Sequence, residues 1–90
     1  VLDDLASESL RLTQHYAGSA VCSPSRAALL TGRYPIRTGA ITPPEVLGYD
    51  RIGLEETTIA DSFKASGYST GMVGKWHNGA LGPRFHPNAR

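Results

Sequence analysis

Residues 22–32 read Cys-Ser-Pro-Ser-Arg-Ala-Ala-Leu-Leu-Thr-Gly, and they constrain the fold most because they contain both a helix start and a helix stop. Proline is favoured in the first turn of a helix, where its missing N–H is not needed, so Pro24 predicts a helix start. Alanine and leucine continue the helix, and Gly32 can end it in a left-handed cap. We therefore predict a helix over residues 24–31, with Cys22 just before it.

The start of this helix has the properties of an anion site. Its free backbone N–H groups and the positive end of the helix dipole favour a bound anion such as sulfate or phosphate. Arg26, one turn into the helix, adds a fixed positive charge. Cys22 is the only cysteine, so it cannot form an internal disulfide. A lone cysteine is usually a small buried apolar residue, and here Pro24 and Arg26 are what favour a chemical role instead.

A helix and a strand are predicted before this motif. Apolar residues at helical spacing predict a helix over residues 2–8. Asp3 and Asp4 fall near its start, where carboxylates interact favourably with the helix dipole, and we interpret them as helix-start residues. Alternating apolar and polar residues predict a short strand over residues 11–16.

The second half of the chain repeats this alternation after an irregular connection. Residues 33–53 are rich in proline and glycine and predict a long loop. Thr58 and Asp61 resemble a capping box, which predicts a helix that Gly67 ends. Residues 68–73 follow as a predicted buried strand. Helices and strands in this order favour an α/β fold with a parallel sheet, in which ligands bind beyond the carboxyl ends of the strands.

A second motif, Gly-Lys-Trp-His, follows the last predicted strand. Lys75 and His77 are alternate residues, so in an extended segment their side chains point the same way while Trp76 points the other way and can pack. Together with Arg26 they would form a cationic pocket for a tetrahedral anion. Taken singly, Lys75 could be a solvated surface charge and His77 a core histidine with one hydrogen bond.

The two motifs closely resemble the two signatures of the sulfatase family. The Cys-x-Pro-x-Arg signature is matched at Cys22, Pro24, Ser25, Arg26, Leu29, Leu30, Thr31 and Gly32. The second signature, which ends in Gly-Lys-Trp-His, is matched over residues 67–77, although Asn78 stands where leucine is commoner. The resemblance implies an alkaline-phosphatase-like α/β/α sandwich with a mostly parallel sheet. It also implies that residues 1–90 are part of a larger catalytic domain, truncated at both ends and inactive alone.

The resemblance further implies a sulfuric ester hydrolase. In that family a formylglycine-generating enzyme oxidises the signature cysteine, here Cys22, and the hydrated aldehyde attacks sulfur to form a covalent sulfo-enzyme. By resemblance, Arg26 holds the formylglycine, Lys75 contacts it and the sulfate, and His77 hydrogen-bonds or deprotonates the hydrate. The family also binds a divalent cation, usually calcium. Cys22, as formylglycine, is one of its ligands, and the others are expected outside this chain.

Charge and hydropathy exclude some classes of binding partner. The net charge is +1, with 9 basic and 8 acidic side chains spread along the chain, so we expect no nucleic-acid or membrane partner. No apolar stretch approaches the roughly 18 residues of a membrane-spanning helix. A sulfate-ester small molecule or a sulfated glycan is the expected substrate. The compartment is not fixed by the residues, and the resemblance implies a periplasmic, secreted or lysosomal protein.

Two alternatives stay open at this point. Some relatives in the same superfamily use the same modified cysteine on phosphorus, so the chain could belong to a phosphonate or phosphate ester hydrolase. In the other alternative Cys22 is never modified, and the chain is a non-catalytic module whose thiol, at a helix N-terminus, is reactive.

Overall fold

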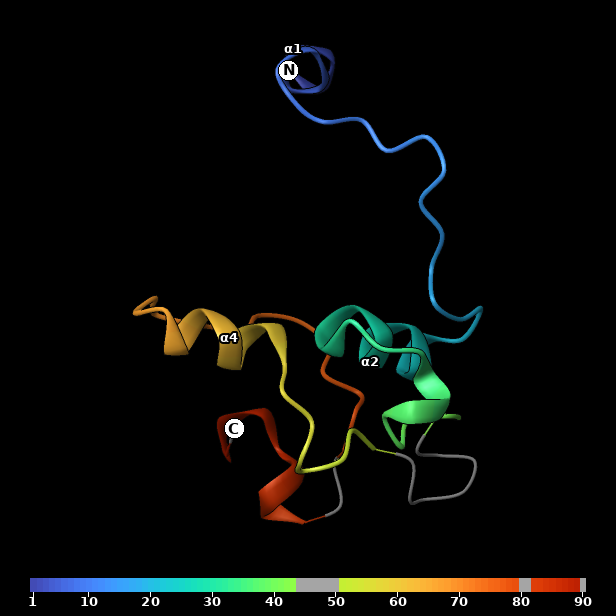
Figure 1. Ribbon diagram of the computed structural model, residues 1–90, viewed down its shortest axis with the longest axis vertical. Helices are drawn as coiled ribbons and strands as arrows, with labels where there is room; N and C mark the ends of the chain where they lie inside the picture. The colour runs from blue at the N-terminus through green and yellow to red at the C-terminus, as the bar shows by residue number, and fades with distance from the viewer. Residues whose placement is uncertain (44–50, 80–81, 90) are drawn as a thin grey trace.

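The computed structural model describes residues 1–43, 51–79 and 82–89 (Figure 1). Within these ranges the regular structure consists of α-helices and short 3-10 helices. In chain order they are α1 (Leu2–Ser7), α2 (Cys22–Thr31), η1 (Pro35–Arg37), α4 (Ile59–Ala65), η2 (Pro83–Phe85) and η3 (Pro87–Ala89). No helix in the described ranges is long and apolar enough to cross a membrane.

Helix α2 lies at the centre of the folded part and confirms the predicted start and stop signals. It begins at Cys22 rather than after it, with Val21 in an extended conformation as the N-cap. Pro24 occupies the first turn, and Gly32 ends the helix with a φ of 66°, a left-handed conformation that glycine adopts without steric cost. The cysteine is therefore fixed by the helix itself.

Helix α4 lies beside α2 (Figure 1). Local hydrogen bonds cap it at both ends. The Thr58 backbone N–H donates to Asp61 Oδ2 at 2.8 Å, and the Asp61 N–H donates to Thr58 Oγ1 at 3.3 Å, which confirms the capping box. At the other end Gly67 has a φ of 86°, and the Tyr68 N–H donates to the Phe63 carbonyl at 3.0 Å. The rings of Phe63 and Tyr68 meet edge to face at 5.3 Å, the apolar contact that often accompanies this kind of helix end.

The core is small and lies against α2. Ala27, Ala40 and Ile52 are fully buried, and Leu30 and Trp76 pack against them half-buried. These residues come from α2, from the loop that follows it, from the segment before α4 and from the second motif. The core therefore joins the two sequence motifs.

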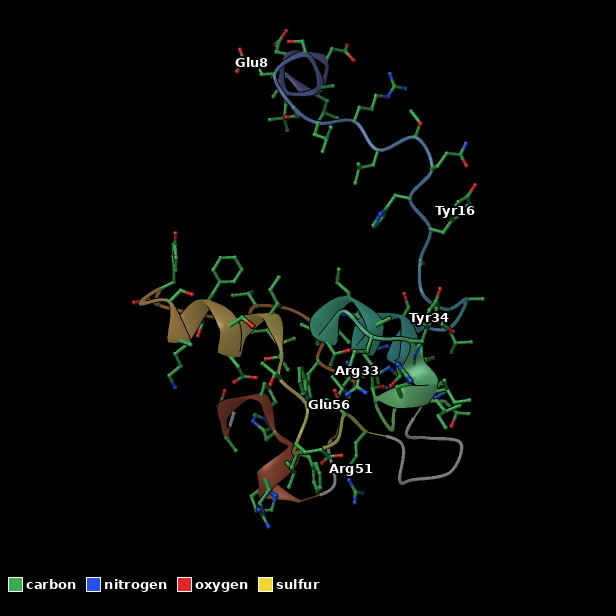
Figure 2. All side chains as sticks on the ribbon, viewed as in Figure 1. Glu8, Tyr16, Arg33, Tyr34, Arg51 and Glu56 are labelled. Atoms are coloured by element: carbon green, nitrogen blue, oxygen red, sulfur yellow. The ribbon has the colours of Figure 1, made fainter. Side chains whose placement is uncertain are left out.

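An ion pair ties the end of α2 to the segment before α4. Arg33 Nη1 lies 2.7 Å from Glu56 Oε1 and 2.8 Å from Oε2, and Figure 2 shows the two side chains directed toward each other. The Glu56 side chain is only 6% exposed, whereas that of Arg33 is 48% exposed. A carboxylate this deeply buried needs such a partner.

The two predicted strands are wrong for this chain. Residues 11–16 and 68–73 are irregular, and no residue in the described ranges belongs to a strand. A strand needs a neighbouring strand for its backbone hydrogen bonds, and neither segment has one among the residues that the structure describes. Their side chains are exposed, Val73 completely, and α1, although helical as predicted, stands apart from the rest of the chain (Figure 1).

The predicted irregular connection over residues 33–53 is confirmed where it is described. It contains only the short helix η1, and residues 44–50 lie outside the described residues.

Candidate active site

The two sequence motifs meet at Cys22 and His77. Cys22 Sγ lies 3.4 Å from His77 Nδ1, although the residues are 55 positions apart. Cys22 is the exposed first residue of α2, and His77 is half-buried in the loop after Gly74. The structure thus brings together a cysteine on a helix N-terminus and an imidazole that can accept or donate a proton.

The Arg26 side chain holds the second motif by a hydrogen bond to the backbone of that motif. Its Nη1 donates to the Lys75 carbonyl oxygen at 2.7 Å. Its Nε is buried and has no hydrogen-bond partner among the residues that the structure describes. Arg26 therefore fixes the chain next to His77.

The Lys75 side chain is not part of this cluster. It is exposed, and its ammonium group makes no hydrogen bond or ion pair among the described residues. The prediction that Lys75 and His77 point the same way assumed an extended backbone, but His77 has a left-handed φ of 55° and Gly74 a φ of 122°. The backbone therefore does not continue with the two-residue alternation of a strand.

Trp76 packs on the core, as predicted. Its Nε1 donates to the Gly79 carbonyl at 3.1 Å and to the Phe85 carbonyl at 3.0 Å. The indole thus anchors the segment that carries Lys75 and His77.

Ser23 and Asn78 were not among the predicted site residues. Both are fully buried, and Ser23 Oγ donates to the His77 carbonyl at 2.6 Å. The sequence offers one hint of their role, which is that Ser23 directly follows Cys22 and Asn78 directly follows His77.

A hollow of about 910 Å³ opens beside Cys22 and Arg26. Its other walls come from residues 15–18 of the N-terminal segment and from Arg33 and Tyr34 after α2. His15 therefore lies at the edge of the same space. Arg33, a further cationic side chain, thus lines the same hollow as Cys22 and Arg26.

Residue 18 shows how closely the N-terminal segment approaches α2. A Cβ atom at Gly18 would lie 2.6 Å from the Ala28 Cβ, closer than real atoms approach. Only glycine lets the segment run along the helix at this distance.

A calcium site cannot be assembled from the residues that the structure describes. They contain no group of three or more histidine, cysteine, aspartate or glutamate side chains that could hold a metal ion. Calcium prefers six to eight oxygen ligands, so Cys22, even as formylglycine, does not make a site by itself.

Sequence comparisons show which proteins this chain resembles. The family model described as Sulfatase matches residues 1–83. The chain is 46% identical to arylsulfatase G of Canis lupus familiaris over 99% of this chain and 16% of that protein. It is 49% identical to arylsulfatase H of Canis lupus familiaris over 87% of this chain and 15% of that protein. Identity to arylsulfatase A of Homo sapiens is 51%, over 91% of this chain and 16% of that protein.

The chain spans about one sixth of the length of these curated relatives. No solved structure is significantly similar to it. The family match covers both motifs and the segments between them, and the motifs meet in space at Cys22 and His77. The chain belongs to the sulfatase family.

Proposed function

We propose that this chain supplies the nucleophile of a sulfuric ester hydrolase, with Cys22 converted to formylglycine by a formylglycine-generating enzyme. The observation that carries this proposal is the contact between Cys22 Sγ and His77 Nδ1 at 3.4 Å on the first turn of α2. It places a titratable group next to the atom position where the nucleophilic oxygen would stand, as nucleophilic catalysis requires.

The reaction would proceed in two steps on the hydrated aldehyde of residue 22. One hydroxyl oxygen attacks the sulfur of the ester, the bond from sulfur to the alcohol oxygen breaks, and the alcohol leaves with a proton. The second hydroxyl then loses its proton, the bond between carbon and the sulfate oxygen breaks, and the aldehyde re-forms as sulfate departs. His77 Nδ1, which lies 3.4 Å from Cys22 Sγ, is positioned to accept that proton.

Arg26 and the start of α2 support the binding of a sulfate group. The helix N-terminus favours negative charge, and Arg26 adds a cationic side chain to the lining of the hollow beside Cys22. The role of Lys75 as a sulfate contact stays a prediction, since the described structure leaves its side chain in solvent.

The proposal also includes a bound divalent cation and a mostly parallel sheet. A calcium ion would have to take most of its ligands from outside the described residues, so none of the steps assigned here to Cys22 and His77 involves it. The α/β/α sandwich with a mostly parallel sheet likewise requires partner strands beyond those residues. We further propose that residues 1–90 alone do not turn over substrate.

Mass spectrometry of the peptide that contains Cys22, from full-length protein made together with the formylglycine-generating enzyme, tests the proposal. Conversion of the thiol to an aldehyde lowers the mass by about 18 Da. The same preparation is then assayed with a chromogenic aryl sulfate, a probe chosen because the relatives are named arylsulfatases. An unmodified Cys22 would overturn the mechanism, and turnover of a matched phosphate ester instead would favour the phosphorus alternative.

The same contact also favours a second candidate, in which Cys22 keeps its thiol. A cysteine beside a histidine is the arrangement of thiol nucleophiles. In that case iodoacetamide would alkylate Cys22 in the purified protein, and a His77→Ala variant would be alkylated more slowly. Formylglycine at position 22 cannot be alkylated in this way, so one labelling experiment separates the two candidates.

A further inference from the structure

We infer that Ser23 and Asn78 are positioning residues that hold the His77 imidazole against residue 22. This inference rests on the proposed function, because it assigns His77 a part in the chemistry. Neither residue touches the reacting atoms. Both act through the backbone that carries the imidazole.

The two side chains form a buried hydrogen-bonded clamp around the backbone of residues 76–78. Ser23 Oγ donates to the His77 carbonyl at 2.6 Å and lies 3.3 Å from Asn78 Oδ1. Asn78 Nδ2 donates to the Trp76 carbonyl at 3.1 Å. Both residues are 0% exposed, so water does not compete for these bonds.

The position of Asn78 is itself fixed from the other side. Its carbonyl oxygen accepts a hydrogen bond from the Ile52 N–H at 3.3 Å, and Ile52 belongs to the buried core. The clamp is thus tied to the core as well as to the first turn of α2.

His77 needs such a clamp because its backbone conformation is unfavourable. With a φ of 55° it is the only non-glycine residue in the described ranges with a positive φ. Residues with a Cβ atom avoid this region unless the surroundings impose it, and such residues concentrate at functional sites. If the clamp is removed, the backbone can relax toward negative φ, and the ring moves with it.

Because Ser23 directly follows Cys22, the clamp also affects the distance between residue 22 and the imidazole. Consecutive residues, Cys22 and Ser23, contact the side chain and the backbone of the same His77. The Ser23 bond therefore sets the register between α2 and the second motif. A loss of that register changes the distance between residue 22 and the imidazole, not only the stability of the fold.

The test compares Ser23→Ala with Thr38→Ala in the full-length protein. Thr38 is a matched control because it is 2% exposed and its hydroxyl donates to the Pro35 carbonyl at 2.8 Å, but it lies outside the site. For Ser23→Ala we expect kcat on the aryl sulfate to fall about ten- to a hundredfold, the cost of misplacing a reacting group by about 1 Å. KM should stay within about twofold, and Ser23→Thr, which keeps the hydroxyl, should recover much of the loss. Thr38→Ala should lose comparable thermal stability and keep kcat.

A double-mutant cycle separates positioning from a general loss of structure. If Ser23 acts through the imidazole, Ser23→Ala should not lower kcat further in a His77→Ala background. Losses that multiply, or an unchanged kcat in Ser23→Ala, would overturn the inference.

A failure of the proposed function can be distinguished from a failure of this inference. A wild-type protein that is neither modified at Cys22 nor active on sulfate esters rejects the proposed function, whatever Ser23 does. In that case crystal structures of the wild type and of Ser23→Ala decide the inference. Displacement of His77 Nδ1 from residue 22 in the variant would support it, and an unmoved ring would overturn it.

Discussion

Cys22 Sγ and His77 Nδ1 lie 3.4 Å apart because the first turn of α2 and the loop after Gly74 pack on one small core. Arg26 strengthens this junction by donating to the Lys75 carbonyl at 2.7 Å. Two motifs that are separate in sequence therefore form one site, and the contacts that join them involve both side chains and backbone.

Replacing His77 with alanine should lower kcat on an aryl sulfate about 10²- to 10⁴-fold, the range for a positioned acid or base. The reason is that the variant loses the group within 3.4 Å of residue 22 that can take the proton of the hydrate. The peptide mass at residue 22 should be measured in the same sample, so that a failure of modification is not mistaken for a loss of catalysis.

His86→Ala is the matched control for that experiment. His86 is exposed and does not line the hollow beside Cys22. Its activity should equal that of the wild type, and equal losses in His86→Ala and His77→Ala would contradict the assignment of His77.

Arg33→Ala should destabilise the protein by about 1–2 kcal/mol, less than a fully buried pair would lose, because the arginine is half exposed. The variant removes two close contacts from the Glu56 carboxylate, whose side chain is 6% exposed. Urea unfolding of the full-length protein measures the change. Arg37→Ala, an exposed arginine with no ion pair among the described residues, should stay within about 0.5 kcal/mol of the wild type.

The interaction between Arg33 and Glu56 can be isolated with one further variant. If they stabilise each other, the double variant Arg33→Ala/Glu56→Gln should lose less than the sum of the single variants. Additive losses would show that the pair contributes nothing as a pair.

The parts of the fold that sequence predicts well depend on contacts within one or two helical turns. Pro24 and Gly32 bound α2, and Thr58 with Asp61 begins α4, because each signal is completed by backbone groups a few residues away. The strand at residues 68–73 fails for the opposite reason, since a strand depends on a partner that sequence neighbours cannot provide.

Some residues of the site can likewise be predicted from the sequence, and others cannot. The sequence motifs identify Cys22, Arg26 and His77, which the structure brings together. They do not reveal the buried clamp at Ser23, because its partner is a backbone carbonyl 54 residues away. The expected common direction of the Lys75 and His77 side chains assumed an extended backbone, and an alternation rule cannot anticipate the left-handed turn at His77.

Thr58→Ala should reduce the free energy of unfolding by about 0.5–2 kcal/mol through the loss of a helix N-cap. The threonine hydroxyl accepts from the Asp61 N–H, and Thr58 is only 5% exposed, so solvent replaces this bond poorly. The neighbouring exposed Thr57 provides the control, and Thr57→Ala should leave the unfolding midpoint nearly unchanged. Equal effects at the two positions would show that the cap does not stabilise α4.

Gly18→Ala should weaken substrate binding more than it slows the chemistry. The added Cβ would lie 2.6 Å from the Ala28 Cβ, so the segment of residues 15–18 must move away from α2 and reshape the hollow beside Cys22. We expect KM for the aryl sulfate to rise about three- to tenfold with a smaller change in kcat, the pattern of lost uniform binding.

Two variants show whether that effect comes from the contact with Ala28. At Gly71 an added Cβ meets nothing within 4 Å, so Gly71→Ala should keep the wild-type KM. The double variant Gly18→Ala/Ala28→Gly removes the opposing atom and should restore KM, at a cost of about 1 kcal/mol in stability for a glycine inside a helix. A KM that stays high in the double variant would mean that the N-terminal segment does not form this wall of the hollow by packing on α2.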